Sequence, residues 1–244
     1  MAIQIKSQDE IAKMRIAGQL ACDVLEMITP HVKAGVTTDE LNTLCADYTE
    51  KVQKAISAPL NYHNFPKSIC TSINHVVCHG IPDNTVLKDG DIINIDITVI
   101  KDGYHGDTSK MFLIGEVTPE SSRLSRLAQE ALYIGLKKVK PGNDFGEIGT
   151  AIQKFIKSKG RYSIVKDYCG HGIGVDFHEE PQIVHYKNKA GEKMQEGMCF
   201  TIEPMINLGK AQTTLDKEDN WTVYTSDGKN SAQWEHTLVV TKTG

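Results

Sequence analysis

The sequence has 244 residues and a formal net charge of −4. This length can bury a sizeable core, in one large domain or two small ones. Basic residues are scattered along the chain, which argues against a nucleic-acid-binding surface. No apolar run approaches the ~20 residues of a membrane span, and the N-terminus lacks the apolar core of a signal peptide.

The sequence contains six cysteines, none of which forms a Cys-x-x-Cys pair. A structural zinc knuckle is therefore not indicated. Together with the missing signal peptide, this pattern favours free thiols in a cytoplasmic protein. The cysteines are Cys22, Cys45, Cys70, Cys78, Cys169 and Cys199.

Two capping-box patterns predict helices near the start of the chain. The Ser-x-x-Glu pattern at residues 7–10 predicts a helix over about 8–28, where apolar residues recur at helical spacing. The Thr-x-x-Glu pattern at residues 37–40 predicts a second helix over about 38–56.

A β-hairpin is predicted after a segment, residues 59–90, that is rich in Asn, His, Pro and Gly and indicates loops and short strands. Residues 92–100 alternate and are β-branched, which predicts a strand. The turn signal at residues 101–103 predicts a partner strand over about 104–113.

The second half repeats helices and then strands. Thr118-Pro119-Glu120 opens a predicted helix with Pro at its first position, and another helix is predicted over about 144–159. Strands are predicted near residues 162–166, 198–206, 221–225 and 234–241.

The sequence also repeats itself weakly at an offset of 107 residues. Coincidence is one explanation, since a turn, a glycine and an apolar run are common. Four matched blocks in the same order instead favour two related halves that share an interface. The blocks are residues 32–35, 40–41, 87–90 and 95–96, which match residues 139–142, 147–148, 194–197 and 202–203.

Two carboxylates interrupt the predicted hairpin. If it turns at residues 102–103, Thr98 faces Asp107, and Asp96 lies one diagonal step away, roughly 7–8 Å at Cα. Carboxylates at that separation can converge on two metal ions ~3.5–4 Å apart. A buried Asp96 also needs a metal or a basic partner, because an unpaired charge is costly to bury.

Acidic residues interrupt apolar strands again in the second half, at Glu203 and Glu235. Each alone could be an edge-strand carboxylate that faces water. The repetition favours a metal site, to which we add His171 because glycines flank it, although an incidental loop histidine is the alternative. A set of four carboxylates and one imidazole suits Mn(II), Fe(II), Co(II) or Zn(II).

Seven short motifs contain these residues and several further histidines. They cover residues 74–80, 94–96, 105–108, 169–174, 177–181, 200–204 and 233–236. Together, over nearly the whole chain, they closely resemble type I methionine aminopeptidase in its short bacterial-type form.

The resemblance implies an α+β fold of the pita-bread type, in which two pseudo-symmetric αβ halves share a central antiparallel sheet with flanking helices. We therefore expect one catalytic domain over residues 1–244, with halves of approximately 1–115 and 116–244. The short spacing between His178 and Glu203 leaves no room for the helical insert of the type II enzymes.

The resemblance also implies the roles of the metal ligands. Asp96, Asp107 and Glu235 would be shared by two divalent metals (Co, Mn, Fe or Zn), and His171 and Glu203 would complete one of them. A monovalent cation, Na or K, would bind the backbone carbonyls of three residues. These residues are Asn74, Val76 and Ser231.

The implied reaction is removal of N-terminal methionine from nascent proteins with a small second residue. A metal-bridged hydroxide would attack the scissile carbonyl, with Glu203 as general base. His178 would hydrogen-bond the carbonyl oxygen or oxyanion, and His79 would contact the scissile amide nitrogen.

The resemblance places a methionine pocket at five residues. Ordinary packing is the alternative for Tyr62 and Phe65, and a strand-core position for Trp221. The chain departs from the family pattern at Pro59, where cysteine is common, and at Phe65, where tyrosine is common; both changes keep the pocket apolar. The five residues are Tyr62, Phe65, Cys70, Phe177 and Trp221.

Two other functions compete with this one. A proline-type aminopeptidase of the same fold usually has an extra N-terminal domain, whereas the first predicted helix here starts at Ser7. A non-catalytic peptide-binding relative should lack ligands, yet all five are present. We expect a cytoplasmic monomer that binds no specific nucleic acid or membrane; the sequence leaves a ribosome contact and the physiological metal open.

Overall fold

The computed structural model describes residues 2–244. Helix α1 (Gln8–Ile28) begins at the predicted capping box, in which the Ser7 N–H donates to Glu10 Oε2 at 2.7 Å. Helix α2 (Thr38–Asp47) begins at the second box but ends earlier than residue 56. A π-helical turn, Tyr48–Val52, follows it, and Lys54 then takes a left-handed backbone conformation (φ 52°) that directs the chain into a strand.

The second half contributes two helices. Helix α3 (Pro119–Leu136) begins after Thr118, whose hydroxyl accepts from the Ser121 N–H, and Pro119 lies in its first turn as predicted. Helix α4 (Gly146–Ser158) lies within the predicted range. Both helices bury one apolar face, as amphipathic helices that pack on a core do.

Fourteen strands are found in the described chain. They are β1 (Ile56–Ser57), β2 (Cys70–Ile73), β3 (Val76–Cys78), β4 (Ile92–Lys101), β5 (Tyr104–Leu113), β6 (Ser163–Ile164), β7 (Gly170–Gly172), β8 (Glu179–Ile183), β9 (Cys199–Ile202), β10 (Met205–Asn207), β11 (Thr213–Leu215), β12 (Val223–Thr225), β13 (Ser231–Gln233) and β14 (Glu235–Val239).

One large antiparallel sheet organises these strands, in the order β1-β4-β5-β14-β9-β7-β8, with β2 also paired to β4. Two three-stranded sheets, β13-β10-β6 and β11-β12-β3, complete the structure. The hairpin of β4 and β5 has the predicted register, since Thr98 pairs with Asp107. The predicted strand over 198–206 is instead two strands in different sheets, because the chain leaves the large sheet at Glu203-Pro204.

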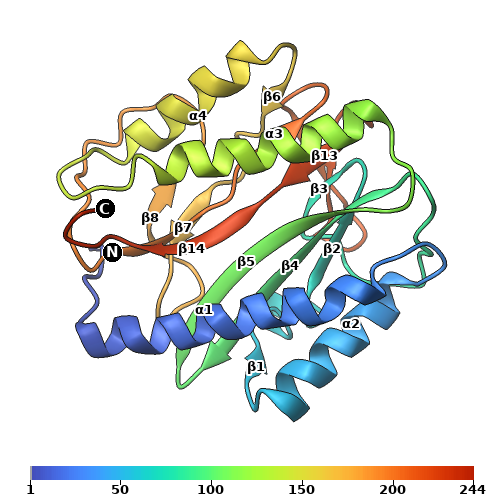
Figure 1. The fold of residues 1–244 in the computed structure, drawn as a ribbon, viewed down its shortest axis with the longest axis horizontal. Coiled ribbons are helices and arrows are strands. Elements are labelled where there is room, and N and C mark those ends of the chain that lie inside the picture. Colours follow the sequence, from blue (N-terminus) through green and yellow to red (C-terminus); the bar gives the residue numbers. More distant parts are fainter. Residues whose placement is uncertain (1) are drawn as a thin grey trace.

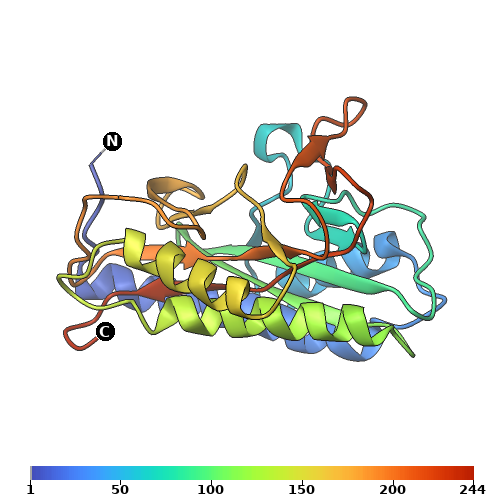
Figure 2. The same ribbon diagram turned by 90° about the horizontal axis from the view of Figure 1, so that it is seen from above.

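The helices and the loops lie on opposite faces of the large sheet. Helices α1 and α3 run along one face (Figure 1), whereas the β11–β12 hairpin and the 3₁₀ segment Tyr62–Asn64 rise from the other face (Figure 2). Among the described residues, no helix is long and apolar enough to cross a membrane.

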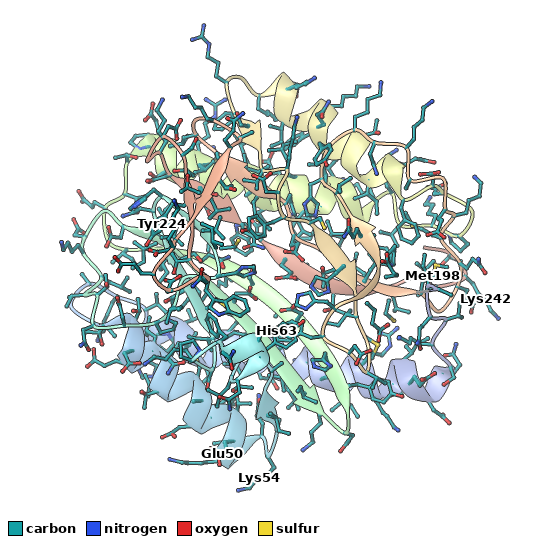
Figure 3. The ribbon with its side chains drawn as sticks, turned by 180° about the vertical axis from the view of Figure 1, so that it is seen from behind. Glu50, Lys54, His63, Met198, Tyr224 and Lys242 are labelled. Atoms are coloured by element: carbon teal, nitrogen blue, oxygen red, sulfur yellow. The ribbon has the colours of Figure 1, made fainter. Side chains whose placement is uncertain are left out.

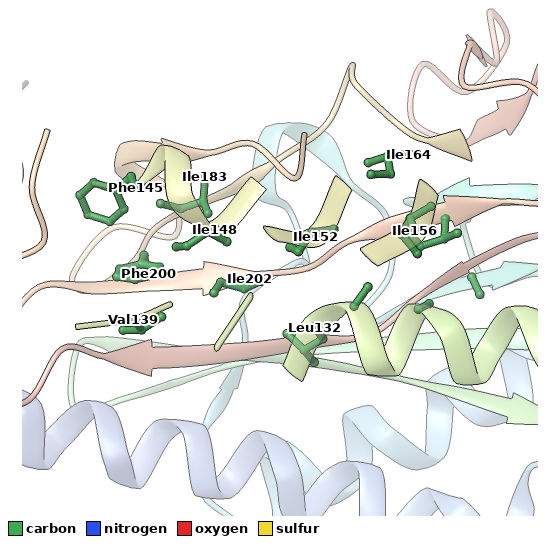
Figure 4. Close-up of a cluster of buried hydrophobic side chains, with 14 of the residues drawn as sticks. Leu132, Val139, Phe145, Ile148, Ile152, Ile156, Ile164, Ile183, Phe200 and Ile202 are labelled. Carbon is green, nitrogen blue, oxygen red and sulfur yellow. The ribbon is translucent and has the colours of Figure 1, made fainter. Parts of the chain in front are cut away.

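Two main apolar clusters underlie the helical layer. One is built largely from α3, α4 and β9, where Leu132, Ile152 and Phe200 are fully buried (Figure 4). The other lies between α1 and the β4–β5 hairpin and includes Val24 and Ile95. Each half of the chain therefore supplies most of its own core.

The 107-residue repeat has a counterpart in the backbone hydrogen bonds. The Gly35 N–H donates to the Leu87 carbonyl at 2.8 Å, and the Gly142 N–H donates to the Met194 carbonyl at 2.9 Å. An isolated bridge between residues 37 and 86 likewise repeats between residues 144 and 193. In the centre of the sheet, the β4–β5 pair lies beside the β14–β9 pair, so the two halves meet between β5 and β14.

The contact between α1 and β5 provides a test of the fold. A Cβ at Gly106 would collide with the backbone of Ala17 and Gly18, whereas a Cβ at Gly18 would meet no atom. Gly106→Ala should therefore lower the free energy of unfolding, by about 1–3 kcal/mol for an overpacked site. Gly18→Ala, the control, should raise it by up to about 1 kcal/mol because alanine favours the helix. Urea denaturation measures both, and equal effects would contradict the described packing.

Candidate functional site

Four carboxylates form a row across the centre of the large sheet. Asp96 on β4 pairs with Ser109 on β5, which in turn pairs with Glu235 on β14. His236 pairs with Ile202, so Glu203 follows β9 directly beside Glu235. Asp107 lies two residues before Ser109, and its side chain therefore faces the same side of the sheet.

One imidazole completes this group. His171 on β7 has Nε2 at 3.6 Å from Glu203 Oε1 and at 3.8 Å from Asp107 Oδ2. Ligand atoms of Asp107, His171 and Glu235 all lie within 4.8 Å of one another. The structure thus brings together all five residues that the sequence predicted as metal ligands.

Burial sets the protonation of this group. It raises the pKa of Glu203 to about 8 and that of Asp96 to about 6, and it holds the pKa values of Asp107 and Glu235 well above the ordinary carboxyl range. Burial lowers the pKa of His171 to about 4, so its imidazole is neutral near pH 7. A neutral imidazole has a free lone pair for a metal ion.

The carboxylates also leave oxygen atoms without partners. Asp96 Oδ1 and Glu235 Oε1 are buried and accept no hydrogen bond from the residues described. None of the lining residues within 2–244 is Lys or Arg, so no basic side chain there compensates the acids. Buried charge of this kind requires a partner, and an oxygen-rich set with one nitrogen fits divalent cations.

A hydrogen-bond network that the sequence did not predict fixes the ligand side chains. Thr201 Oγ1 accepts from the His171 N–H at 3.0 Å and donates to Glu203 Oε1 at 2.7 Å. The other oxygen of Glu203 accepts from Gln233 Nε2 at 3.1 Å, and Thr98 donates to Asp107 at 2.8 Å. These polar residues are buried, a signal that becomes visible only once the sheet register is known.

The carboxylates lie at the bottom of a central cavity of about 450 Å³. His63 lies near the middle of Figure 3, on the face opposite α1 and α3, and its neighbour Tyr62 lines the cavity. All five residues predicted for a methionine pocket line it, as does Pro59. The lining also includes residues that the sequence did not single out, among them Tyr168, Gln182 and Met205.

Aromatic contacts shape the cavity wall. The rings of Phe65 and Trp221 meet edge to face with centroids 5.2 Å apart, and Tyr62 lies 5.0 Å from Phe177. Cys70, which is buried, pairs with Asp96 across β2 and β4. The wall is therefore apolar beside the acidic floor.

Two further histidines flank the carboxylates. His178 Nδ1 lies 2.8 Å from the Tyr62 hydroxyl, and its ring centroid is 4.2 Å from that of His171. His79 has a left-handed backbone (φ 56°), and burial lowers its pKa to about 4. The next residue is Gly80, where a Cβ would collide with the Thr71 carbonyl, so the backbones touch there.

The three residues predicted to bind a monovalent cation lie away from this cavity. The Asn74 carbonyl accepts from the Ser231 N–H at 2.8 Å, and Val76 begins the neighbouring strand β3. Ser231 Oγ is buried and has no hydrogen-bond partner among the described residues. The structure thus brings Asn74 and Ser231 together.

Comparisons with known proteins agree with this geometry. The model of metallopeptidase family M24 matches residues 12–242. The chain is 58% identical to methionine aminopeptidase of Escherichia coli (strain K12), an alignment that covers 100% of this chain and 92% of the relative. It is similar to the crystal structures of methionine aminopeptidase from Rickettsia prowazekii (TM-score 0.97, 52% identity, covering 100% and 98% of the two chains) and Thermotoga maritima (0.96, 33%, 100% and 97%).

The buried acids predict how stability depends on pH in protein stripped of metal. The pKa of Glu203 is about 8, so the folded chain keeps protons that the unfolded chain has lost, and the free energy of unfolding should fall from about pH 6.5 to about pH 8. The neutral histidines act in the opposite direction, but only below about pH 6.5. Urea titrations with a chelator measure this slope, and added Mn(II) should reduce it. The prediction is wrong if, without metal, the free energy of unfolding rises over this pH range.

Proposed function

The chain belongs to metallopeptidase family M24, among its methionine aminopeptidases, and we propose that it releases the N-terminal methionine of nascent proteins whose second residue is small. The geometry of the site provides the main support for this proposal. Four carboxylates and a neutral imidazole converge on the floor of a cavity with an apolar aromatic wall. This arrangement suits hydrolysis next to a flexible apolar side chain.

The proposed metal site takes two divalent ions. Asp96, Asp107 and Glu235 would hold both ions, and His171 and Glu203 would complete one of them. The unpartnered oxygens of Asp96 and Glu235 support this assignment, and Co, Mn, Fe and Zn fit the donor set. Such ions supply Lewis-acid chemistry: water loses a proton near neutral pH, and a carbonyl becomes more electrophilic.

Glu203 is the proposed general base. Its carboxyl lies on the cavity floor with Oε1 3.6 Å from His171 Nε2, where it can take a proton from water and pass it to the leaving amine. Thr201 and Gln233 hold its two oxygens in place, so little reorganisation is needed when the proton moves. A base whose oxygens are fixed in this way does not have to be oriented before each reaction.

His178 and His79 are proposed to bind the scissile peptide. If the Tyr62 hydroxyl donates to His178 Nδ1, the ring carries its proton on Nε2 and can donate it to the carbonyl oxygen or the oxyanion. His79 is proposed to contact the amide nitrogen. The methionine side chain would occupy the aromatic wall between Tyr62, Phe65 and Trp221, together with Cys70 and Phe177.

The remaining parts of the proposal concern a monovalent cation, the cellular compartment and a ribosome contact. One monovalent cation, Na or K, would bind the carbonyls of Asn74, Val76 and Ser231, and the buried Ser231 Oγ supports a polar ligand nearby. The enzyme would work as a cytoplasmic monomer, and six free cysteines support a reducing compartment. A ribosome contact is a further element of this proposal.

The identity to methionine aminopeptidases over the whole chain favours this function over a proline-type aminopeptidase. The assembled ligand set disfavours a non-catalytic relative.

The direct test is release of methionine from Met-Ala-Ser by protein loaded with Mn(II), Fe(II) or Co(II). Free methionine should appear with at least one metal, because the aromatic wall accepts its side chain. Leu-Ala-Ser, the matched control, should react far more slowly. A folded protein that releases no methionine with any of the three metals would exclude the proposed function.

A Glu203→Gln variant tests the base. The amide keeps the shape and the contact with Thr201 but cannot accept the proton, so kcat should fall by about 10²-fold or more. Glu192→Gln, on the exposed surface, is the control and should keep wild-type kcat. Wild-type turnover in Glu203→Gln would show that another group is the base.

Metal content tests the proposed ligands Asp96 and Glu235. Asp96→Ala and Glu235→Ala should each lose bound metal and activity together, because each removes a carboxylate proposed to bridge both ions. Metal content by plasma emission spectroscopy, measured beside the peptide assay, checks this. Full metal content in either variant would rule out that residue as a ligand.

A further inference from the structure

A buried ion pair links the N-terminal segment to the chain around the cavity. Lys6 Nζ lies 2.6 Å from Glu179 Oε2, and the two side chains are only 2% and 10% exposed. The lysine–carboxylate pairs elsewhere in residues 2–244 are much more exposed. A lysine buried this deeply requires its partner, since an unpaired buried charge is strongly destabilising.

The backbone of Lys6 is fixed independently of this pair. Its N–H donates to the Gly197 carbonyl at 2.8 Å, and the preceding Ile5 bridges to Met198, the residue before β9. Ala2 and Gln4 of the same segment line the central cavity. Lys6 is therefore an anchor point beside the cavity mouth, from which its side chain reaches to β8.

Glu179 in turn closes the turn formed by residues 174–179. Its second oxygen, Oε1, accepts from the Asp176 N–H at 3.3 Å. At Gly174 a Cβ would collide with the Lys6 side chain, which lies across the start of the turn. The Gly174 carbonyl accepts from both the N–H and Nδ1 of His105, at 2.9 and 3.1 Å. The turn is thus held by Lys6 at one side and by β5 at the other.

This turn carries two residues of the site. Phe177 stacks on His105 with centroids 5.5 Å apart, and His178 stacks on Phe177 at 4.4 Å. Both rings line the cavity, although His178 itself is exposed to solvent. The His178 ring contacts Tyr62, His171 and Phe177, and its backbone is part of the turn, so the position of the ring depends on the turn beneath it.

We propose that Lys6 is a positioning residue that, through Glu179, holds the 174–179 turn so that His178 meets the scissile carbonyl. The inference rests on the proposed function, because it uses the proposed role of His178. The five metal ligands all lie outside the turn. Loss of Lys6 should therefore affect the reaction of bound substrate more than metal content.

Three variants separate positioning from stability. Lys6→Met keeps the side-chain length and leaves Glu179 buried without its partner, so it should lower both stability and kcat. Lys6→Met/Glu179→Met replaces the pair with apolar side chains, which is often neutral or stabilising. It should restore stability but not activity, since the Asp176 N–H has then lost its acceptor. Lys6→Arg, which preserves the charge, should restore most of kcat.

The measurements are kcat and KM for Met-Ala-Ser, metal content, urea stability and the imidazole NMR signals of His178. The double variant should keep its metal and lose roughly 10- to 100-fold in kcat, with a smaller change in KM, because misplaced groups cost rate. The His178 signals should shift or broaden. Lys51→Met, which breaks the exposed pair with Asp47, is the matched control and should change nothing.

Two outcomes would overturn the proposal. One is wild-type kcat in a stable double variant, and the other is a double variant that does not fold, which would make Lys6 a purely structural residue. Failure of the proposed function is distinguishable from both, because the wild-type chain would then release no methionine in the same assay.

Discussion

Four carboxylates converge on the floor of one cavity, and no basic side chain among the described lining residues offsets them. Left alone, such a group either binds protons or opposes folding, as the raised pKa values of Asp107 and Glu235 indicate. The surrounding chain is arranged around this constraint. Hydroxyl and amide groups from Thr98, Thr201 and Gln233 hold Asp107 and Glu203 in place, while one oxygen each of Asp96 and Glu235 has no partner among the described residues.

The two related halves explain how so many acids reach one place. Each half builds most of its own apolar core against its own helices, and each delivers acidic strands to the centre of the sheet. The row of Asp96, Glu235 and Glu203 crosses the boundary between β5 and β14. Neither half alone contains the set, so the chemistry belongs to the interface and the cores only support it.

Much of this arrangement could be predicted from local signals. Capping boxes located α1 and the start of α2, and the turn at residues 102–103 fixed the register of β4 with β5. Pairings between distant segments could not be predicted, because no local pattern encodes the register of β5 with β14. The strands β7, β11 and β13 have only three residues each, too few for a recognisable pattern, and the break at Glu203 moves the chain between sheets. Lys6 and Glu179 are far apart in sequence and carried no signal.

The glycines beside the site have a consequence for how the protein can change. Gly80, Gly106 and Gly172 adjoin His79, Asp107 and His171, and at each one another backbone lies where a Cβ would be. Contacts between main chains therefore fix the positions of these functional side chains. Such contacts do not depend on the identity of the side chains in the neighbouring segment. Apolar residues of the two cores can be exchanged for others of similar shape with little effect on the site, whereas a side chain at any of these three positions would displace another backbone. Mutational tolerance should therefore be lower at these three glycines than at the apolar residues of either core.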